Sequence, residues 1–220
     1  MVELFLQGGP FMYPILACLA LGLMFVLERF FTLTRASINR RKFMTKLNRA
    51  LDEGGIEQAR ELCSKTRGPV ASVVHAGLLR ANRGLDAVEK AIMSAGTIEM
   101  AFLEKNLVWI STFISIAPML GFTGTVAGMV AAFQSIAEAN DISPSIVAGG
   151  ISQALLTTLF GLIVAIILQF FNNYFISKID KMVLDMEEAS VEFVDLMVGQ
   201  RETSTVDVTE TGDKSGMKNA

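Results

Sequence analysis

Three long runs of uncharged, predominantly apolar residues dominate the pattern of this sequence. They cover Leu4–Leu27, Leu107–Ile136 and Ile142–Ser177. A helix needs about 20 apolar residues to cross a bilayer, and these runs are too long for ordinary buried core helices. Lipid offers the backbone no hydrogen-bond partners, so a chain that crosses it must satisfy its own backbone groups. The pattern predicts an all-α, polytopic membrane protein with three transmembrane helices.

The breaks between these runs divide the chain into eight segments. We expect an external segment at 1–10, transmembrane helices at 11–31, 107–136 and 145–177, a helical cytoplasmic region at 32–106, a periplasmic turn at 137–144, a cytoplasmic helix extension at 178–199 and a tail without regular structure at 200–220. The tail is assigned this way because it is polar and has no apolar periodicity.

Helical spacing of apolar residues also runs through the region 32–106. Gly54-Gly55 and Gly68-Pro69 separate short amphipathic helices there. No stop signal follows Leu85, so the pattern predicts one long helix over Leu85–Ile136. Pro118 lies inside it and should kink it or free a backbone carbonyl. Two of the transmembrane helices are therefore expected to extend far into the cytoplasm.

The placement of positive charge predicts the orientation in the membrane. Thirteen Lys or Arg residues lie between Arg35 and Lys105, and five more follow Ser177, whereas the residues before Pro10 and the link 137–144 contain none. The positive-inside rule then puts the N-terminus in the periplasm and the C-terminus in the cytoplasm. Arg35, Arg40, Arg41 and Lys42 should anchor the first span at the cytoplasmic headgroups.

Small residues recur at helical spacing in the second and third spans, where they allow two helices to approach closely. The second span carries Gly121, Gly124, Thr125, Gly128, Ala131 and Ala132. The third carries Gly150, Ala154, Thr158, Gly161 and Ala165, and these share one helix face. We expect both stripes to pack around a narrow pore.

Two hydroxyls in these stripes lie at similar depth. Thr125 is about 18 Å from the external end of its span and Thr158 about 21 Å, by helical rise. Repeated around an oligomer, they would form a polar ring in an apolar conduit. The alternative is that each hydroxyl bonds a backbone carbonyl or joins two helices, and for Thr157 this is the preferred interpretation. Gln153 is a further pathway candidate, although its amide can equally bridge water or backbone.

The second and third uncharged runs contain no titratable side chain of the kind that ion transport requires. Intramembrane relays normally use a titratable side chain. We therefore expect such a group to come from another chain. No phosphate-binding loop occurs, the only histidine is His75, and nothing indicates a nucleophile–base pair, a metal site, a cofactor or nucleic-acid binding. An enzyme is not indicated.

Three ordered stretches resemble the MotA/TolQ/ExbB proton-channel family, and the ExbB/TolQ branch in particular. They are Leu103-Glu-Lys-Asn-Leu107, Ala117-Pro-Met-Leu-Gly-Phe-Thr-Gly-Thr-Val-Ala-Gly-Met-Val-Ala-Ala-Phe133 and Gly150-Ile-Ser-Gln-Ala-Leu-Leu-Thr-Thr-Leu-Phe-Gly-Leu-Ile-Val-Ala-Ile166. The order of three spans and one large cytoplasmic loop agrees over nearly the whole chain.

The resemblance implies a subunit of an ion-gradient-driven motor in the bacterial inner membrane. It implies a homopentamer around a dimer of a single-span, ExbD- or TolR-like partner, whose membrane Asp takes the proton. Thr125 and Thr158 match the family's pore threonines. Such a motor couples proton or sodium flow to work in the cell envelope, such as energised outer-membrane transport.

The sequence departs from the family pattern at two places in the third span. Gln153 stands where many members have a Glu, which leaves the choice between H⁺ and Na⁺ open. Ile166-Ile167 stands where Ile-Pro is usual, which indicates a straighter helix.

Two other functional classes compete with the motor. A structural membrane scaffold would use the small stripes only for packing and would conduct nothing. A permease of an ATP-driven importer would need a cytoplasmic coupling helix that fits an ATPase.

Overall fold

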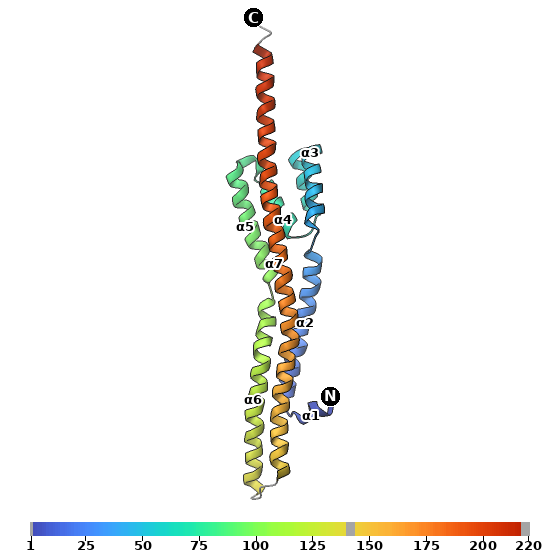
Figure 1. Ribbon diagram of the computed structural model, residues 1–220, viewed down its shortest axis with the longest axis vertical. Coiled ribbons are helices and arrows are strands. Elements are labelled where there is room, and N and C mark those ends of the chain that lie inside the picture. The colour runs from blue at the N-terminus through green and yellow to red at the C-terminus, as the bar shows by residue number, and fades with distance from the viewer. Residues whose placement is uncertain (1, 140–143, 217–220) are drawn as a thin grey trace. The chain divides into compact units, whose positions relative to one another are not determined.

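The computed structural model describes residues 2–139 and 144–216, and all its regular structure is helical (Figure 1). The elements are α1 (Val2–Gln7), α2 (Met12–Ala36), α3 (Arg40–Lys65), α4 (Pro69–Leu78), the 3₁₀ turn η1 (Ala81–Arg83), α5 (Leu85–Glu104), α6 (Leu107–Ala139) and α7 (Pro144–Gly216). The predicted all-α class is confirmed.

Three helical stretches are long and apolar enough to cross a membrane. They lie within Met12–Lys65, Leu85–Glu138 and Val147–Gly199, and each range contains an 18-residue window of sufficient hydropathy with few charges. The expectation of three transmembrane helices is thereby confirmed. The predicted extension of two of them into the cytoplasm stays a prediction.

The chain divides into two compact units. Unit 1 comprises Met1–Thr32 and Glu104–Ser177, and unit 2 comprises Leu33–Leu103 and Lys178–Ala220. Unit 1 therefore collects the three uncharged runs, while unit 2 holds most of the charged residues. Half of the turn expected at 137–144, residues 140–143, lies outside the described residues, and the other half belongs to the ends of α6 and α7.

In unit 1, α2 packs through small and aromatic side chains. A Cβ added at Gly22 would lie 2.6 Å from a methyl group of Leu168 on α7, so this glycine makes room for the leucine. Phe25 stacks on Trp109 and Phe113 of α6, with both pairs of ring centroids 6.2 Å apart. Offset aromatic pairs add to the stabilisation that burial gives.

The single helix predicted over Leu85–Ile136 must be corrected, because Lys105 and Asn106 interrupt it. Asn106 adopts a left-handed conformation with φ of 66°. Asparagine tolerates this region better than most residues. Its side-chain amide donates a hydrogen bond of 3.0 Å to the Glu28 carboxylate on α2. The break is therefore fixed by a contact with a residue far away in the sequence.

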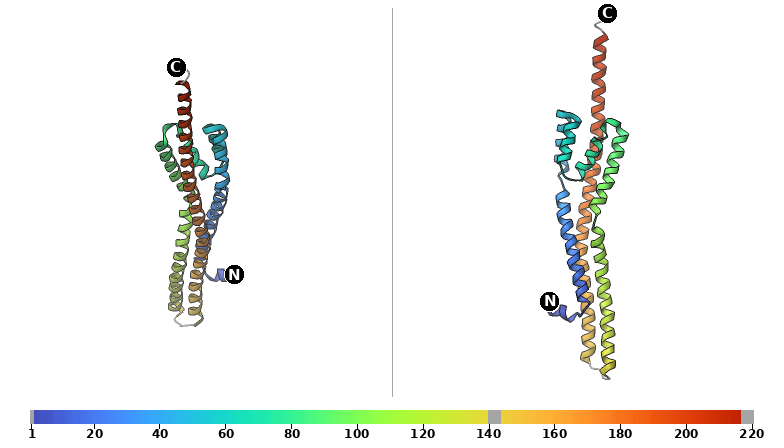
Figure 2. Two further views of the ribbon diagram at one scale, coloured as in Figure 1. Left: turned by 45° about the horizontal axis from the view of Figure 1, so that its top comes forward. Right: turned by 180° about the vertical axis from the view of Figure 1, so that it is seen from behind.

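In unit 2, α7 lies between α3 and α5 in each of the three views (Figures 1 and 2). Phe193 of α7 is fully buried, and a Cβ added at Gly77 of α4 would lie 2.8 Å from its ring. A side-chain carbon of Ile92 on α5 would lie 3.0 Å from the same added Cβ. The small residue on α4 thus brings α4, α5 and α7 together around one aromatic ring.

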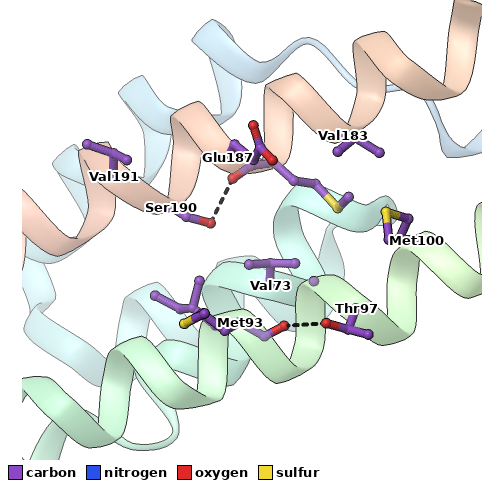
Figure 3. Close-up of a pocket in the computed structure, with 11 residues that line it drawn as sticks. Val73, Met93, Thr97, Met100, Val183, Glu187, Ser190 and Val191 are labelled. Atoms are coloured by element: carbon purple, nitrogen blue, oxygen red, sulfur yellow. Dashed lines mark hydrogen bonds between the residues drawn. The ribbon is translucent and has the colours of Figure 1, made fainter.

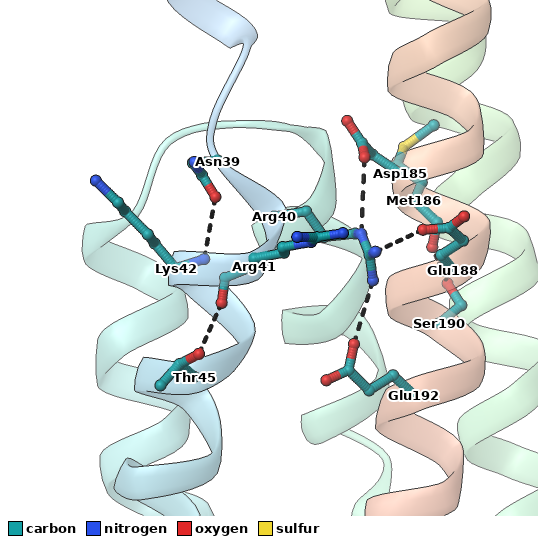
Figure 4. Close-up of polar contacts among 10 residues, drawn as sticks. All are labelled: Asn39, Arg40, Arg41, Lys42, Thr45, Asp185, Met186, Glu188, Ser190 and Glu192. Carbon is teal, nitrogen blue, oxygen red and sulfur yellow. Dashed lines mark hydrogen bonds and ion pairs between the residues drawn. The ribbon is translucent and has the colours of Figure 1, made fainter.

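Arg40 joins the start of α3 to α7 (Figure 4). Its guanidinium lies 3.7 Å from Asp185, 2.6 Å from Glu188 and 3.3 Å from Glu192. These acids recur at helical spacing, so they lie on one face of α7. Arg40 was expected to anchor the first span at lipid headgroups, and this assignment must be corrected: its partners are the carboxylates of α7.

Helix α7 extends to Gly216, into the segment that composition predicts to lack regular structure. Residues 200–216 contain no proline, and a helix that is already formed propagates at little cost per residue. The change to polar residues at 200 therefore does not coincide with the end of α7. The last four residues of the predicted tail, 217–220, lie outside the described residues.

The buried thiol of Cys63 on α3 provides a test of this fold. Burial raises the pKa of Cys63 from 9.0 to about 12, so the thiol stays protonated at neutral pH. In a Cys18→Ala background, we expect Cys63 to react with iodoacetamide at pH 8 at least tenfold more slowly than in the denatured chain. The matched control is Cys63→Ala with Ser64→Cys, which moves the thiol to an exposed neighbour.

The sign of the pH dependence follows from the raised pKa. The contribution of the protonated thiol to folding stability is complete below pH 9 and declines as the pH rises toward 12. Equal alkylation rates for Cys63 and Ser64→Cys would contradict the buried position.

Candidate functional site

Helices α6 and α7 meet at backbone distance where the two small stripes face each other. A Cβ added at Gly161 would lie 2.6 Å from the Ala117 carbonyl oxygen and 3.2 Å from the Gly121 Cα. One added at Gly121 would lie 2.9 Å from the Thr157 carbonyl oxygen. No larger residue fits at either position without moving a helix. Close approach of this kind gives membrane helices their packing energy.

The same contact continues along both helices. Gly124 faces the Thr157 side chain, Gly128 faces Ala154, and Gly150 faces Ala132. The predicted packing residues Gly121, Gly124, Gly128, Gly150, Ala154 and Gly161 thus lie along one α6–α7 contact within a chain. Ala165 is half-buried on the same side of α7.

Two adjacent hydroxyls of α7 converge on a single carbonyl of α6. Thr158 donates a hydrogen bond of 3.1 Å to the Gly121 oxygen. Thr157 is fully buried and donates to Ala154 on its own helix at 2.7 Å, with the Gly121 oxygen at 3.3 Å. For Thr157 this is the helix-joining role that sequence reasoning preferred. For Thr158 it is the link between helices that was weighed as the alternative, and the pore position stays a prediction.

Thr125 lies one helical turn after Gly121 and is partly exposed. Its hydroxyl donates to the Phe122 carbonyl of the same helix. Because Thr158 contacts Gly121, Thr125 and Thr158 are separated along the helix direction by about one turn, or about 6 Å. A threonine oxygen that donates one hydrogen bond can still accept others. The ring of these hydroxyls in an oligomer stays a prediction.

Gln153 lies away from the two threonines that were expected to share its path. Its amide is placed against Gly9, in the link between α1 and α2, where an added Cβ would overlap the amide nitrogen. Gly9 has φ of 72°, a conformation that favours glycine. The pathway role of Gln153 stays a prediction.

Pro118 sits inside α6, whose helical assignment runs unbroken from Leu107 to Ala139. Proline has no N–H, so the Ile114 carbonyl loses its usual helical donor. The neighbouring Ala117 carbonyl forms part of the close contact with Gly161. The kink at Pro118 stays a prediction.

Sequence reasoning missed two features that the structure brings together. One is the set of carboxylates around Arg40, for which acids at 185, 188 and 192 on one helix face were the available signal. The other is the contact of Asn106 with Glu28. Nothing in the sequence pattern marked this pair, because it depends on how α2 and α6 pack.

Comparison with known proteins gives one family and several relatives. Residues 65–188 match the model of the MotA/TolQ/ExbB proton channel family. A putative biopolymer transport protein ExbB homolog of Methanothermobacter thermautotrophicus is 32% identical over 180 residues, which is 81% of this chain and 64% of that protein. This chain thus matches less than two thirds of that relative's length.

Shorter matches extend to two further named groups. The biopolymer transport protein ExbB of Xanthomonas campestris pv. campestris is 35% identical over 97 residues, 44% of this chain and 38% of that protein. The Tol-Pal system protein TolQ of Haemophilus influenzae is 34% identical over 85 residues, 37% of each chain.

The α6–α7 contact predicts different outcomes for two glycines of the same membrane region. Gly121→Ala should separate the helices and destabilise the protein by about 1–3 kcal/mol, the usual cost of overpacking. Gly149→Ala is the matched control, because a Cβ there meets nothing within 4 Å. Thermal unfolding in detergent would measure both. Equal melting temperatures for the two variants would contradict the close contact.

Proposed function

Because the chain belongs to the MotA/TolQ/ExbB proton channel family, we propose that it is a subunit of an ion-gradient-driven motor of the bacterial inner membrane. Several copies surround the single span of an ExbD/TolR-like partner. Proton or sodium flow at the boundary between the copies and the partner is coupled to work in the cell envelope, such as energised outer-membrane transport. In the family arrangement the copies number five and the partner is a dimer.

One observation carries this proposal: the α6–α7 contact is lined by small residues and hydroxyls and contains no charged side chain. Thr158 in this contact and Thr125 one turn after Gly121 supply partly exposed hydroxyls, and neither 107–136 nor 144–177 contains a charged residue. Such a wall can pass an ion only if a titratable or charged group is brought to it. The carboxylate of a partner helix supplies that group.

The coupling follows from where the partner's carboxylate is most stable. When it is ionised, it favours the hydroxyl positions of the wall, because Thr125 and Thr158 can turn their O–H groups from the Phe122 and Gly121 carbonyls to the carboxylate. A charge in a low-dielectric site is costly without such hydrogen-bond donors. When it has bound an ion, the neutral group accepts the apolar parts of the wall. Each binding event therefore changes the preferred position of the partner helix, and the ion gradient drives this change in one direction.

The orientation and the absence of enzymatic chemistry belong to the same proposal. The N-terminus lies in the periplasm, and both unit 2 and the C-terminus lie in the cytoplasm, as the distribution of Lys and Arg predicts. The subunit catalyses no covalent reaction. It provides a wall and a scaffold, and the work is done through the partner.

A non-conducting scaffold is the second candidate, because the same hydroxyls already form bonds that join helices. Thr158 and Thr157 both reach the Gly121 carbonyl. Vesicles containing the purified subunit with its partner separate the two functions. The motor requires ion flux that depends on the partner, whereas a scaffold gives none.

Removing the Thr158 hydroxyl tests the motor directly. Thr158→Val keeps the side-chain shape but removes a polar group from the wall. We expect partner-dependent flux to fall at least about tenfold, equivalent to about 1.4 kcal/mol in the barrier. Size-exclusion chromatography of the detergent-solubilised complex should show unchanged assembly.

The matched control is Thr123→Val on α6. Thr123 is exposed, and its hydroxyl bonds only the Met119 carbonyl of its own helix, so flux should persist. Full flux in a variant carrying both Thr125→Val and Thr158→Val would reject the hydroxyl ring. A loss in Thr123→Val equal to that in Thr158→Val would show that any lost hydroxyl impairs the helix.

A further inference from the structure

An apolar groove with an acidic edge lies between α5 and α7 in unit 2 (Figure 3). It encloses about 420 Å³, and its walls include Met93, Met100, Val183 and Val191. Met93 is 72% exposed and Val191 64% exposed, although both belong to the apolar lining. Glu187 projects at the edge of the groove. Exposed apolar surface of this kind marks interaction sites.

The helices that form the groove carry an excess of negative charge. In unit 2, α5 contributes Asp86, Glu89 and Glu99 against Lys90. Residues 178–199 of α7 contribute six acids against two lysines, and three of these acids (Asp185, Glu188 and Glu192) are paired with Arg40 of α3. Glu89 lies one turn before Met93 on the same face of α5. Glu89 and Glu187 therefore flank the apolar wall from two helices, and neither forms an ion pair with any described residue.

The first half of α3 has the opposite charge. Residues 40–51 contain five basic residues and no acid. Arg40 is occupied by the acids of α7 (Figure 4), but the other four are exposed and form no ion pair within the described residues: Arg41, Lys42, Lys46 and Arg49. These four residues are here called the basic face.

The basic face and the groove belong to helices on opposite flanks of unit 2. The views agree that α3 lies on one side of α7 and α5 on the other (Figures 1 and 2). A surface on one flank that complements a different surface on the other flank produces a heterologous contact. Such contacts generate rings when the rotation between copies closes.

We propose that neighbouring copies of this chain dock through unit 2, with the basic face of one copy laid across the α5–α7 groove of the next. The alkyl stems of Lys46 and Arg49 cover the apolar rim at Met93 and Val191, as long basic side chains commonly do. Their charged ends reach Glu89 and Glu187. This contact rests on the oligomer in the proposed function and adds to it the surfaces that join the copies.

A lipid surface would satisfy only half of these observations. Basic residues close to a transmembrane helix bind anionic headgroups. That interaction would cover the basic face but leave the groove and its acids uncovered. Docking between copies covers both surfaces at once, and each copy offers both. The second copy is therefore the occupant that the charges favour.

Cysteine crosslinking in the membrane tests the contact. Thr45 lies among the residues of the basic face and is exposed, and Met93 lies on the rim of the groove. A chain carrying Thr45→Cys and Met93→Cys, in a Cys18→Ala and Cys63→Ala background, should give a ladder of crosslinked copies with a short bis-maleimide. Chains carrying Thr45→Cys alone or Met93→Cys alone should give no crosslinked products on a denaturing gel, because a heterologous contact brings different surfaces together.

Charge reversal then tests the complementarity. Lys46→Glu with Arg49→Glu should reduce ladder formation at least fivefold, and Glu89→Lys with Glu187→Lys should do the same. Combining all four substitutions in the crosslinkable chain should restore the ladder, since every contact is again complementary. The absence of a ladder in the unreversed chain, a ladder that ends at dimers, or no restoration would each overturn the proposal.

Two further readouts separate this contact from the lipid alternative and from the proposed function. After reconstitution, the crosslinked ladder should form to within twofold equally in vesicles of neutral lipid and in vesicles containing anionic lipid. A ladder that forms in neutral vesicles but is lost in anionic ones would show that lipid occupies the basic face and would overturn the contact. Partner-dependent ion flux without any ladder would reject the contact while leaving the motor function intact.

Discussion

The approach of α6 to α7 at backbone distance is the constraint on which the rest of unit 1 depends. Gly121 and Gly161 leave no room for a side chain between the helices, and the Gly121 carbonyl becomes the acceptor for Thr158. Packing and polarity are thus fixed by the same few residues. A larger residue at either glycine would move the hydroxyl as well as the helix, so stability and the proposed ion path cannot be changed independently.

The distribution of charge complements this constraint. Unit 1 keeps its α6–α7 contact free of charge, and unit 2 concentrates carboxylates and guanidinium groups that bind one another, as Arg40 and its three acids do. An uncharged wall does little by itself in a low-dielectric medium. In the proposed motor, its value lies in the hydroxyls that it offers to the carboxylate of the partner helix. In the proposed docking, the charged unit provides the surfaces through which copies associate.

The sequence predicted the features that arise from repeated residue patterns, but it did not predict contacts between single pairs of residues. Uncharged runs predicted three spanning helices, and small residues at helical spacing predicted which face of α7 would pack closely. Asn106 was missed because its break depends on Glu28, a partner on another helix. Gln153 was considered as a pathway residue, and its proximity to Gly9 could not be predicted because it depends on how the link between α1 and α2 packs on α7. The helical end of α7 was misjudged because polarity does not by itself terminate a helix.

The most direct test of the central claim is the environment of Thr125 in the assembled complex. Spin labels are placed one at a time at positions 122 to 133, leaving out Gly124, Gly128 and Ala132, which pack against α7. They report collisions with oxygen, which partitions into lipid, and with a water-soluble nickel chelate. A lumen lined by the hydroxyls predicts that nickel accessibility peaks at Thr125 and recurs with helical period, while oxygen accessibility peaks on the opposite face. Maximal oxygen accessibility at Thr125, with uniformly low nickel accessibility, would contradict the account.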